Sequence, residues 1–403
     1  MTKSYPHDSQ NRLSAALIAP QCGHETGAIA DAPDVPIAVK ETTQVNGRRF
    51  ARQARAALDD AREIVAGVLG CAPGDVVFTG GGTESDNTAV LGVVAARGGT
   101  AVCPAAEHHA VLHAVEHVGG RIVTVDRSGR IDLEHLAACV DDGVSVVSVM
   151  AVNNEVGVVT DVAAAAEVAR RANPDVVVHT DAVQAVSWLD LRTITPHVDL
   201  LSLSAHKFGG PKGVGVLVDR GSRLQPLLIG GGQERERRSG TQNVAGIIAM
   251  TEALRLADVE RESECVRLVG LRDRLVDSLS ARLDGVLETV PRDHKVAGSA
   301  HVCLQGVENE ALLYLLDEAG VCASAASACA AGAMEPSHVL AAMGVARDWA
   351  VGALRLTLGR TTTDADVDRA IDAVVDAVTR IRSHGSAQPS GSGASLTRAG
   401  VPS

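Results

Sequence analysis

The stretch SLSAHKFGGPKG, residues 202–213, is the segment that best indicates how this chain folds and what chemistry it supports. Lys207 stands directly behind His206, where an apolar run typical of a strand ends in small residues and a Gly-rich turn. An amine held at a strand exit can form an imine with an aldehyde cofactor, and pyridoxal phosphate is the usual one. Lysine before glycines is also ordinary loop composition, so other residues must decide between the two interpretations.

An acidic residue in DVVVHTDAVQAVS, residues 175–187, is a partner for such a cofactor. Residues 176–178 read as a buried strand, and Asp181 falls just beyond it, at the carboxyl end where α/β sheets place their ligands. The pyridine nitrogen needs an anion, because the protonated ring accepts electrons. Gln184 is suited to bind the phenolic oxygen. Asp181 alone is equally typical of a helix N-cap, but together with Lys207 it favours the cofactor.

The segment FTGGGTESDNTAVLGVVAAR, residues 78–97, has the features of a phosphate site. Residues 76–78 read as a strand, residues 80–82 as a glycine turn that lets the backbone approach closely, and Thr83 as the start of a helix. The positive end of that helix would face the anion. Glu84 argues against a nucleotide P-loop, which would have lysine where this chain has acidic and polar residues.

Two adjacent histidines occur in PAAEHHAVLHAVEH, residues 104–117. His108 or His109 ends a short loop before a helix, where an imidazole can stack on a cofactor ring and exchange protons near neutral pH. Paired histidines are otherwise typical of a solvated helix start. A metal site would require more ligands at defined spacing than this segment contains, so none is expected.

A cysteine in a run of small residues is a candidate nucleophile. Cys329 lies in CASAASACAAGAMEPSHVL, residues 322–340, which reads as a flexible loop before a helix start. Small neighbours leave a thiol accessible, as a nucleophile requires. Most free cysteines are small core residues instead, and this interpretation fits the following ones: Cys71, Cys103, Cys139, Cys265 and Cys303.

Eight motifs between about Arg48 and Arg382 resemble those of the NifS/IscS-type cysteine desulfurases and follow one another in the same order. These are pyridoxal-phosphate enzymes of fold type I, in the class V aminotransferase group. The motifs are FTGGGTESDN, EHHAV, VNNEVGVV, HTDAVQ, SLSAHKFGGPKGVGVL, GGGQERERRSGTQN, SACAAGAMEPSHVL and LRLTLGR. The resemblance implies an α/β fold, with a large domain on a mostly parallel seven-stranded sheet and a smaller C-terminal α/β domain.

The resemblance also implies a role for each matching residue. The catalytic residues would be Lys207, which bonds the cofactor, Cys329, which carries the persulfide, and His108, which stacks on the ring. The cofactor-binding residues would be Thr83, Gly82, Asn154, Asp181, Gln184, Ser204, His206 and Thr241. Of these, Thr241 would reach the phosphate of the neighbouring subunit of a homodimer. Arg355, with Asn154, would bind the substrate carboxylate, which suits the planar guanidinium.

The activity implied by the resemblance is conversion of L-cysteine to L-alanine, with transfer of the sulfur through Cys329 to an acceptor protein or thiol. Residues 11–20, NRLSAALIAP, do not match the start of the family. Two alternatives therefore stay open. One is another pyridoxal-phosphate enzyme of class V, such as a selenocysteine lyase, an epimerase or an aminotransferase. The other is an inactive relative that acts as a scaffold.

Composition restricts the other classes of function. The chain has 403 residues, of which 46% are hydrophobic, so it can bury a large core. Its formal net charge of −12 disfavours direct binding to nucleic acid. Eight cysteines without a CxxC pair indicate reduced thiols and a cytoplasmic protein. No apolar run reaches membrane length, and the first residues lack a signal-peptide core.

Hydrophobic patterning predicts four regions. They are an irregular N-terminal arm at 1–45, a large cofactor-binding domain at 46–265, a small C-terminal domain with the cysteine loop at 266–383, and a disordered tail at 384–403. Strand-like runs recur at 76–78, 144–150, 176–180 and 199–204, and GVGVLVD after the lysine is close enough to pair antiparallel. The pattern also predicts helices at 49–69 and 161–172, and a long one over 243–284 that is interrupted by a break.

Overall fold

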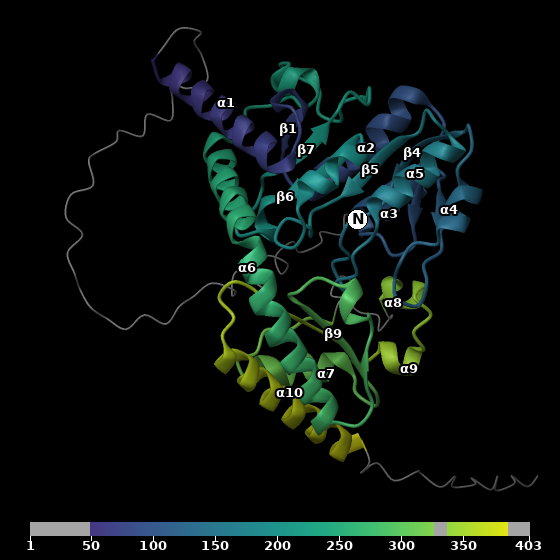
Figure 1. Cartoon of the computed structure of the whole chain (residues 1–403), viewed down its shortest axis with the longest axis vertical. Helices are drawn as coiled ribbons and strands as arrows, with labels where there is room; N and C mark the ends of the chain where they lie inside the picture. Colours follow the sequence, from purple (N-terminus) through teal and green to yellow (C-terminus); the bar gives the residue numbers. More distant parts are fainter. Residues whose placement is uncertain (1–48, 326–336, 386–403) are drawn as a thin grey trace, which may run out of the picture. The chain divides into compact units, whose positions relative to one another are not determined.

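The structure, a computed structural model, describes residues 49–325 and 337–385. Its larger sheet has seven strands in the order β1-β7-β6-β5-β4-β2-β3 (Figure 1). The five strands from β6 to β3 are parallel neighbours, whereas β7 and β1 pair antiparallel. The strands are β1 (Val76–Thr79), β2 (Thr100–Pro104), β3 (Arg121–Val123), β4 (Val144–Ser148), β5 (Val177–Asp181), β6 (Leu200–Ser204) and β7 (Gly215–Asp219). The predicted seven-stranded, mostly parallel sheet is confirmed.

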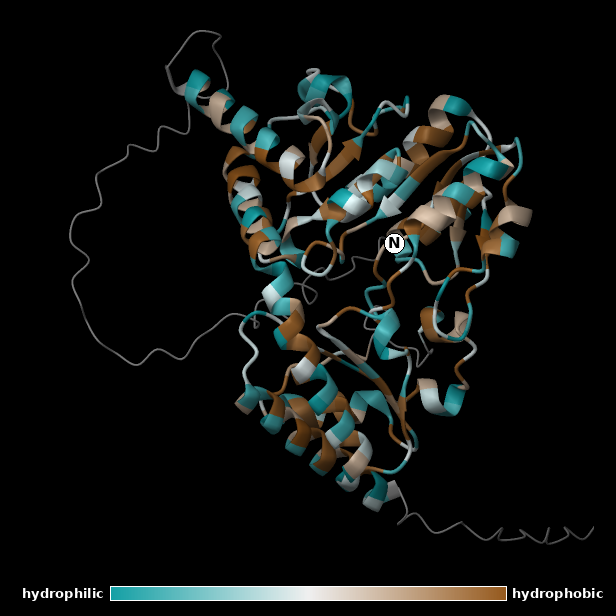
Figure 2. Ribbon diagram, in the orientation of Figure 1, coloured by the Kyte–Doolittle hydropathy of each residue, from teal (hydrophilic) through white to brown (hydrophobic). Residues whose placement is uncertain are grey.

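Helices cover both faces of this sheet, which is why its strands are continuous apolar runs. One face packs against α2 (Gly82–Arg97) and α3 (His109–His117), through residues such as Val90 and Val111. The other face packs against α1 (Arg49–Leu69), α4 (Leu133–Cys139), α5 (Val162–Ala172) and the start of α6 (Val244–Arg282). Figure 2 shows the apolar strands between helices whose outer surfaces are hydrophilic.

The sequence pattern located most of these elements. The helices expected at 49–69 and 161–172 correspond to α1 and α5, and the GVGVLVD segment forms β7, antiparallel to β6 as expected. The pattern missed β2 and β3. Both are short, and β3 lies at the edge of the sheet, so neither presents a long apolar run.

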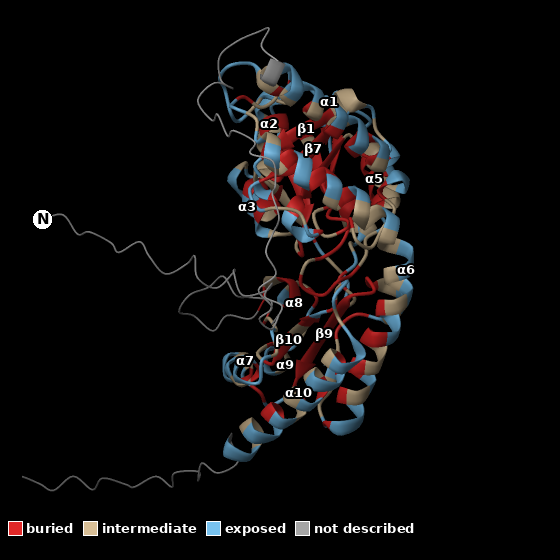
Figure 3. Cartoon of the chain, turned by 90° about the vertical axis from the view of Figure 1, so that its left-hand side faces the viewer, coloured by how far each residue is buried: buried red, intermediate tan, exposed pale blue. Residues whose placement is uncertain are grey.

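A second, three-stranded antiparallel sheet lies in the C-terminal part of the chain. Its order is β10-β9-β8, and its strands are β8 (Val286–Glu288), β9 (Ser299–Leu304) and β10 (Ala353–Thr357). The helices here are α7 (Asn309–Glu318), α8 (His338–Ala342), α9 (Arg347–Ala350) and α10 (Asp364–Gly385). Apolar residues of β9, β10, α7 and α10 form a separate core with the second half of α6. Figure 3 shows buried β9 beside the exposed outer surface of α10.

The expected break in the long helix is wrong, because α6 runs for 39 residues without one. Its beginning packs into the first core through Ile247 and Met250, and its end packs into the second core through Leu268 and Leu275. The charged stretch between these two parts has no helical repeat of apolar residues. Ion pairs between residues three positions apart support the helix there, such as that of Asp258 with Arg261 at 2.6 Å. The domain boundary at 265/266 therefore falls inside one helix and stays a prediction.

No helix within the two described ranges is both long and apolar enough to cross a membrane.

A buried ion pair fixes the loop that precedes α6. The carboxylate of Glu234, 6% exposed, accepts a hydrogen bond from the backbone N–H of Phe78 at 3.1 Å and forms an ion pair with Arg62 at 3.0 Å. Gln242 also donates to this carboxylate. Arg62 in turn lies over the Phe78 ring, 4.6 Å from its centre. The loop that contains Thr241 is thereby tied to α1 and to β1.

We expect the substitution Glu234→Ala to lower the free energy of unfolding by about 3 kcal/mol, because it leaves the Arg62 charge buried without a partner. Chemical denaturation followed by circular dichroism measures this loss. The control is Glu252→Ala, which removes an exposed partner of Arg255 and should change stability by less than about 0.5 kcal/mol. Equal effects of the two substitutions would show that the buried pair has no special role.

Candidate active site

The carboxyl ends of β1, β6 and β5 meet at one edge of the larger sheet, together with the first residue of β7, which lies between β1 and β6. Gly215 pairs with Thr79 at the end of β1 and with Ser204 at the end of β6, and Asp181 at the end of β5 pairs with Ser202. A Cβ atom on Gly215 would lie 2.5 Å from the Leu203 carbonyl oxygen, so only glycine fits there. The register therefore brings the predicted residues of separate motifs to one place, where α/β sheets bind ligands.

Lys207 ends a single 3-10 turn, Ala205–Lys207, that follows β6 directly. The Lys207 side chain reaches the surface. Its pKa is lowered, and the largest cause is partial burial by the surrounding protein. The positive charge of Arg355 lowers this pKa further, whereas the carboxylate of Asp181 raises it. All three groups are thus close enough to interact, and a larger fraction of the Lys207 amine is neutral than for an isolated lysine.

Asp181 is buried, and its carboxylate accepts a hydrogen bond from the backbone N–H of Val183 at 2.8 Å. Burial raises its pKa to about 6, although that hydrogen bond and Lys207 oppose the shift. A carboxylate oxygen of Asp181, one of Asp86 and a ring nitrogen of His108 all lie within 4.8 Å of one another. The site therefore holds a carboxylate that a nearby cation would readily keep ionised.

A buried polar cluster behind Asp181 was missed by the sequence analysis. His179 bonds the hydroxyl groups of Ser148 at 2.8 Å and Ser202 at 2.9 Å, and burial lowers its pKa to about 3. Burial and the charge of Asp181 raise the pKa of Asp86, whose Oδ1 has no hydrogen-bond partner among the described residues. Asp86 stands four positions after Gly82, one helical turn further along α2, and this spacing was the available signal.

Glu107 is a second buried acid that the sequence analysis missed. Its carboxylate accepts a hydrogen bond from the backbone N–H of Met150 at 2.5 Å, and its other oxygen has no partner within the described ranges. Burial and the charge of Asp181 raise its pKa. Burial thus opposes ionisation of all three acids, and Asp181 is the one whose pKa is also lowered by the nearby amine of Lys207.

The start of α2 presents backbone groups that suit an anion. Gly81, at φ +145°, occupies the N-cap without any capping side chain, so the first N–H groups of the helix stay available. A Cβ atom on Gly82 would lie 2.8 Å from Val183, which explains why glycine is required there. Thr83 is exposed beside them, and Ser204 bonds His206 at 2.9 Å across the same space.

Glu84 joins this helix to the loop of Thr241. It accepts a hydrogen bond from the backbone N–H of Gly80 at 2.9 Å and forms an ion pair with Arg238 at 2.8 Å. Thr241 itself is exposed just before α6 begins. A residue that would act on a neighbouring subunit is expected to be exposed in a single chain.

His108 is the N-cap of α3. Its Nδ1 accepts a hydrogen bond from the backbone N–H of Ala110 at 3.1 Å, so the hydrogen of the neutral ring is on Nε2. Burial lowers its pKa to about 4, and the positive charge of Lys207 contributes to the same shift. A neutral imidazole therefore faces the amine.

Arg355 lies on β10 and reaches the site from the C-terminal sheet. Its Nη1 donates to the carbonyl of Asn154 at 2.5 Å, and the backbone of Ser324 bonds that of Arg355 on the neighbouring segment. The Nε group is buried and has no partner in the described part of the chain. An unsatisfied guanidinium donor of this kind can bind a carboxylate. Asn154 thus orients Arg355 through its backbone.

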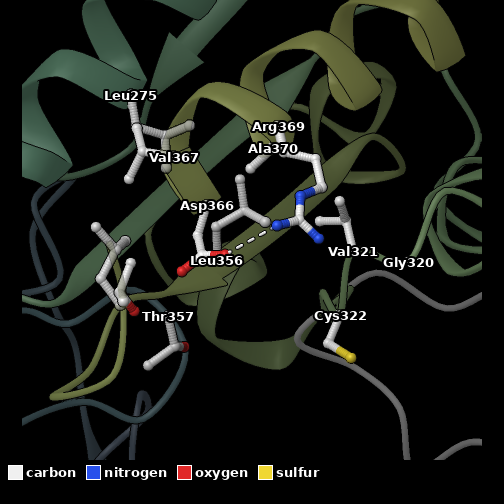
Figure 4. Close-up of a pocket in the computed structure, with 12 residues that line it drawn as sticks. Leu275, Gly320, Val321, Cys322, Leu356, Thr357, Asp366, Val367, Arg369 and Ala370 are labelled. Atoms are coloured by element: carbon white, nitrogen blue, oxygen red, sulfur yellow. Dashed lines mark hydrogen bonds and ion pairs between the residues drawn. The ribbon is translucent and has the colours of Figure 1, made fainter. Parts of the chain in front are cut away.

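Two predicted residues remain, Gln184 and Cys329. Gln184 is half-buried, three positions after Asp181. Cys329 lies outside the described residues. Another thiol, Cys322, is exposed in a separate hollow of about 170 Å³ beside Arg369, which forms an ion pair with Asp366 at 3.2 Å (Figure 4).

Comparisons with known proteins show the family and the fold of this chain. The sequence profile of the family Aminotransferase class-V matches residues 39–370. The chain is 43% identical to an IscS-like cysteine desulfurase of Mycobacterium tuberculosis over 347 residues, which is 82% of this chain and 88% of that protein. It is 39% identical to a cysteine desulfurase IscS of Dictyoglomus turgidum over 342 residues, 83% of this chain and 86% of that protein.

A solved structure described as a NifS-like protein superimposes with a TM-score of 0.78 at 32% identity. The superposition covers 85% of this chain and 93% of that one. The similarity therefore extends over both sheets of the fold and is not confined to the lysine segment.

We expect His108 to stay neutral between pH 5 and 8 in the cofactor-free chain, because its pKa is lowered to about 4. Since this value lies below that of the unfolded chain, protonation destabilises the fold as pH falls from about 6.5 to about 4. NMR of imidazole ¹⁵N nuclei, assigned with His108→Gln, measures the titration. The substitution Lys207→Gln should raise the pKa of His108. A midpoint near 6.5 in the unsubstituted chain would contradict the burial of this ring.

Proposed function

Since the chain belongs to the class-V aminotransferase family, we propose that it is a cysteine desulfurase, which converts L-cysteine to L-alanine and keeps the sulfur as a persulfide on Cys329. The observation that carries the proposal is that Asp181 and Ser204 end neighbouring parallel strands and that Lys207 ends the turn directly after Ser204. An amine, an anion for a heterocycle and a cation for a carboxylate are then available at one sheet edge. Relatives named cysteine desulfurase over more than 80% of the chain support the same activity.

Pyridoxal phosphate, on which this family depends, fits the residues that are present. The start of α2 at Gly81 and Gly82 has no capping side chain, so its backbone N–H groups suit a phosphate group. Thr83, Ser204 and His206 supply polar side chains near this helix start. Asp181 suits the pyridine nitrogen and Gln184 the phenolic oxygen. The proposal thus assigns both ends of the cofactor to described residues.

When bound, pyridoxal phosphate supplies an aldehyde that captures an amine and a protonated ring that stabilises negative charge on the α-carbon. Lys207 would be the amine that holds the cofactor. Once the substrate amine has taken its place, Lys207 would be the base that moves the α-proton of the substrate. Its lowered pKa favours both tasks, because only the neutral amine has a free lone pair. Arg355 contributes to this shift and therefore acts on Lys207 as well as on the substrate.

Asp181 holds a proton on the ring nitrogen by remaining ionised opposite it. Its pKa of about 6 belongs to the cofactor-free chain, and a cation at the ring nitrogen would lower it. Burial and the charge of Asp181 both raise the pKa of Asp86 and of Glu107, so ionisation of either acid is disfavoured while Asp181 is ionised. His108 stays neutral, so it can stack on the ring without repelling the charge of Lys207.

The substrate would be held by its carboxylate. Arg355 offers a buried Nε donor that lacks a partner in the described structure, and the Asn154 carbonyl fixes the guanidinium from the other side. A paired carboxylate satisfies this donor, which is otherwise unfavourable in a buried position. The neighbouring acid Glu155 has its pKa raised by burial and accepts a hydrogen bond from Ser337, so it competes weakly for Arg355.

Sulfur transfer then requires a thiol nucleophile. The thiolate of Cys329 attacks the sulfur of the bound cysteine, the carbon–sulfur bond breaks, and the electron pair stays with the carbon that becomes the methyl group of alanine. The overall reaction is L-cysteine plus the Cys329 thiol to L-alanine plus the Cys329 persulfide, which balances without an oxidant. An acceptor protein or thiol would remove the sulfur in a second step.

A homodimer is part of the proposal. Three consecutive apolar residues, Leu227, Leu228 and Ile229, are exposed after β7, and Ile229 is 83% exposed. The same loop leads to Thr241, which by resemblance would complete the phosphate site of a second copy. Contiguous exposed apolar residues are typical of an interface. The cytoplasmic location stays a prediction from the cysteine content.

We expect Cys329→Ser to bind the cofactor normally but to form neither alanine nor sulfide from cysteine. In the unsubstituted protein, mass spectrometry of the peptide that contains Cys329 should show one added sulfur after incubation with cysteine. The control is Cys322→Ser, which removes the exposed thiol of the separate hollow and should leave turnover unchanged. Normal turnover by Cys329→Ser would favour another class-V enzyme, and cofactor binding without turnover by the unsubstituted chain would favour a scaffold.

We expect Arg355→Gln to raise KM for L-cysteine by roughly 10- to 100-fold. This factor corresponds to the loss of one hydrogen bond between charged groups, which contributes about 1.5–3 kcal/mol. Steady-state measurement of alanine formation tests this. The matched control is Arg360→Gln, since Arg360 is 66% exposed and pairs only loosely with Glu260 at 3.4 Å. An unchanged KM for Arg355→Gln would place the substrate carboxylate elsewhere.

A further inference from the structure

An acidic side chain lies at the helix start to which the proposed function assigns the phosphate of the cofactor. Glu84 is the third residue of α2, and its Oε2 accepts a hydrogen bond from the backbone N–H of Gly80 at 2.9 Å. The carboxylate therefore folds back over the first turn of the helix. It opposes binding of a phosphate there, because the positive end of one helix attracts both anions while the anions repel each other. The proposed reaction gives Glu84 no task.

Arg238 compensates the charge of Glu84. The Nε of Arg238 donates to Oε1 of Glu84 at 2.8 Å and its Nη2 donates to Oε2 at 3.3 Å, so the guanidinium binds both carboxylate oxygens. The two side chains are 23% and 22% exposed, so solvent screens the pair only in part. The hydrogen bond with Glu84 is the largest cause that raises the pKa of Arg238. Arginine–carboxylate pairs with two parallel hydrogen bonds are among the strong ones in proteins.

The pair joins segments that are 154 positions apart in the sequence. Arg238 belongs to the loop that leads to Thr241, whereas Gly80 directly follows β1. A Cβ atom on Gly80 would lie 2.6 Å from Oε2 of Glu84 and 3.9 Å from Nη2 of Arg238. Glycine at this position therefore leaves the room that the carboxylate occupies. The sequence places Gly80 and Glu84 in one motif and Arg238 in another, and the fold brings them together.

Other contacts hold the loop of Arg238 independently of this pair. Glu234 forms the buried ion pair with α1 described above. Arg237 donates to the backbone carbonyl of Gly74 at 2.6 Å. Since these contacts lie outside the Arg238 pair, its loss should leave the loop in place. A substitution of Arg238 therefore changes mainly the compensation of the Glu84 charge.

We propose that Arg238 is a positioning residue that neutralises Glu84 and thereby keeps the start of α2 favourable for the phosphate group of the cofactor. The inference rests on the proposed function, in which pyridoxal phosphate binds at this helix start. Arg238 acts through Glu84, whose two oxygens take its Nε and Nη2 groups. Without Arg238, an uncompensated negative charge would lie beside the phosphate, and the affinity for the cofactor would fall.

Two competing explanations predict different results. If Arg238 binds the phosphate directly, a second substitution at Glu84 cannot restore the affinity. If Arg238 only supports the loop, its loss weakens the binding of the cofactor with and without the phosphate group alike. Pyridoxal, which lacks the phosphate, tests the second explanation, and a paired substitution at Glu84 tests the first.

We expect Arg238→Gln to weaken the binding of pyridoxal phosphate by roughly tenfold and that of pyridoxal by less than about twofold, because the uncompensated charge of Glu84 repels only the phosphate. The double variant Glu84→Gln/Arg238→Gln should bind pyridoxal phosphate within about threefold of the unsubstituted protein, because neither charge is left unpaired. Titration of the cofactor-free full-length protein, followed by the absorption band of the bound cofactor, measures each dissociation constant.

Arg237→Gln is the matched control. It removes the neighbouring arginine of the same loop, whose side chain is 20% exposed and lies 3.4 Å from Asp219, and it should leave the ratio of the two affinities unchanged. Equal affinity of Arg238→Gln and the unsubstituted protein for pyridoxal phosphate would overturn the inference. So would an equal loss of affinity for pyridoxal, or a double variant that binds as weakly as Arg238→Gln. Turnover is a separate readout, since bound cofactor without alanine formation would contradict the proposed function instead.

Discussion

The site depends on holding a carboxylate and an amine at the same edge of a sheet. Asp181 and Ser204 end adjacent parallel strands, and the turn after Ser204 ends at Lys207. Parallel neighbours have their carboxyl ends together, so the register alone brings the two groups close. Burial then shifts the pKa of Asp181 upward and that of Lys207 downward, toward each other and toward neutrality.

Burial opposes charge on several groups around this pair. His179, held by two serine hydroxyl groups, has its pKa lowered to about 3, and burial raises the pKa of Asp86 and of Glu107. An unpaired buried ion is unfavourable by several kcal/mol, so all three shifts favour the uncharged form. Asp181, Lys207 and Arg355 are the charged groups that the proposed chemistry uses.

Helix α3 connects the site to the C-terminal part of the chain. His108 is its N-cap, and the charge of Lys207 contributes to lowering the pKa of His108. The ring centre of the next residue, His109, lies 4.3 Å from that of His338, the first residue of α8. Glu107, just before this helix, accepts a hydrogen bond from His338 through its backbone carbonyl and is a buried acid through its side chain.

The sequence by itself located helices α1 and α5 and several strands, although not β2 and β3. It also identified Lys207, Asp181 and Arg355 as candidates and the glycines at the start of α2, because each has a local pattern or a family motif. Tertiary structure decided what lies between the motifs. Burial and register bring Asp86, Glu107 and His179 to the site, and of these Asp86 alone had a local signal, its helical spacing from Gly82. The unbroken α6 and the contact of His338 with His109 were likewise unpredictable, since packing against two cores and long-range contacts are properties of the folded chain.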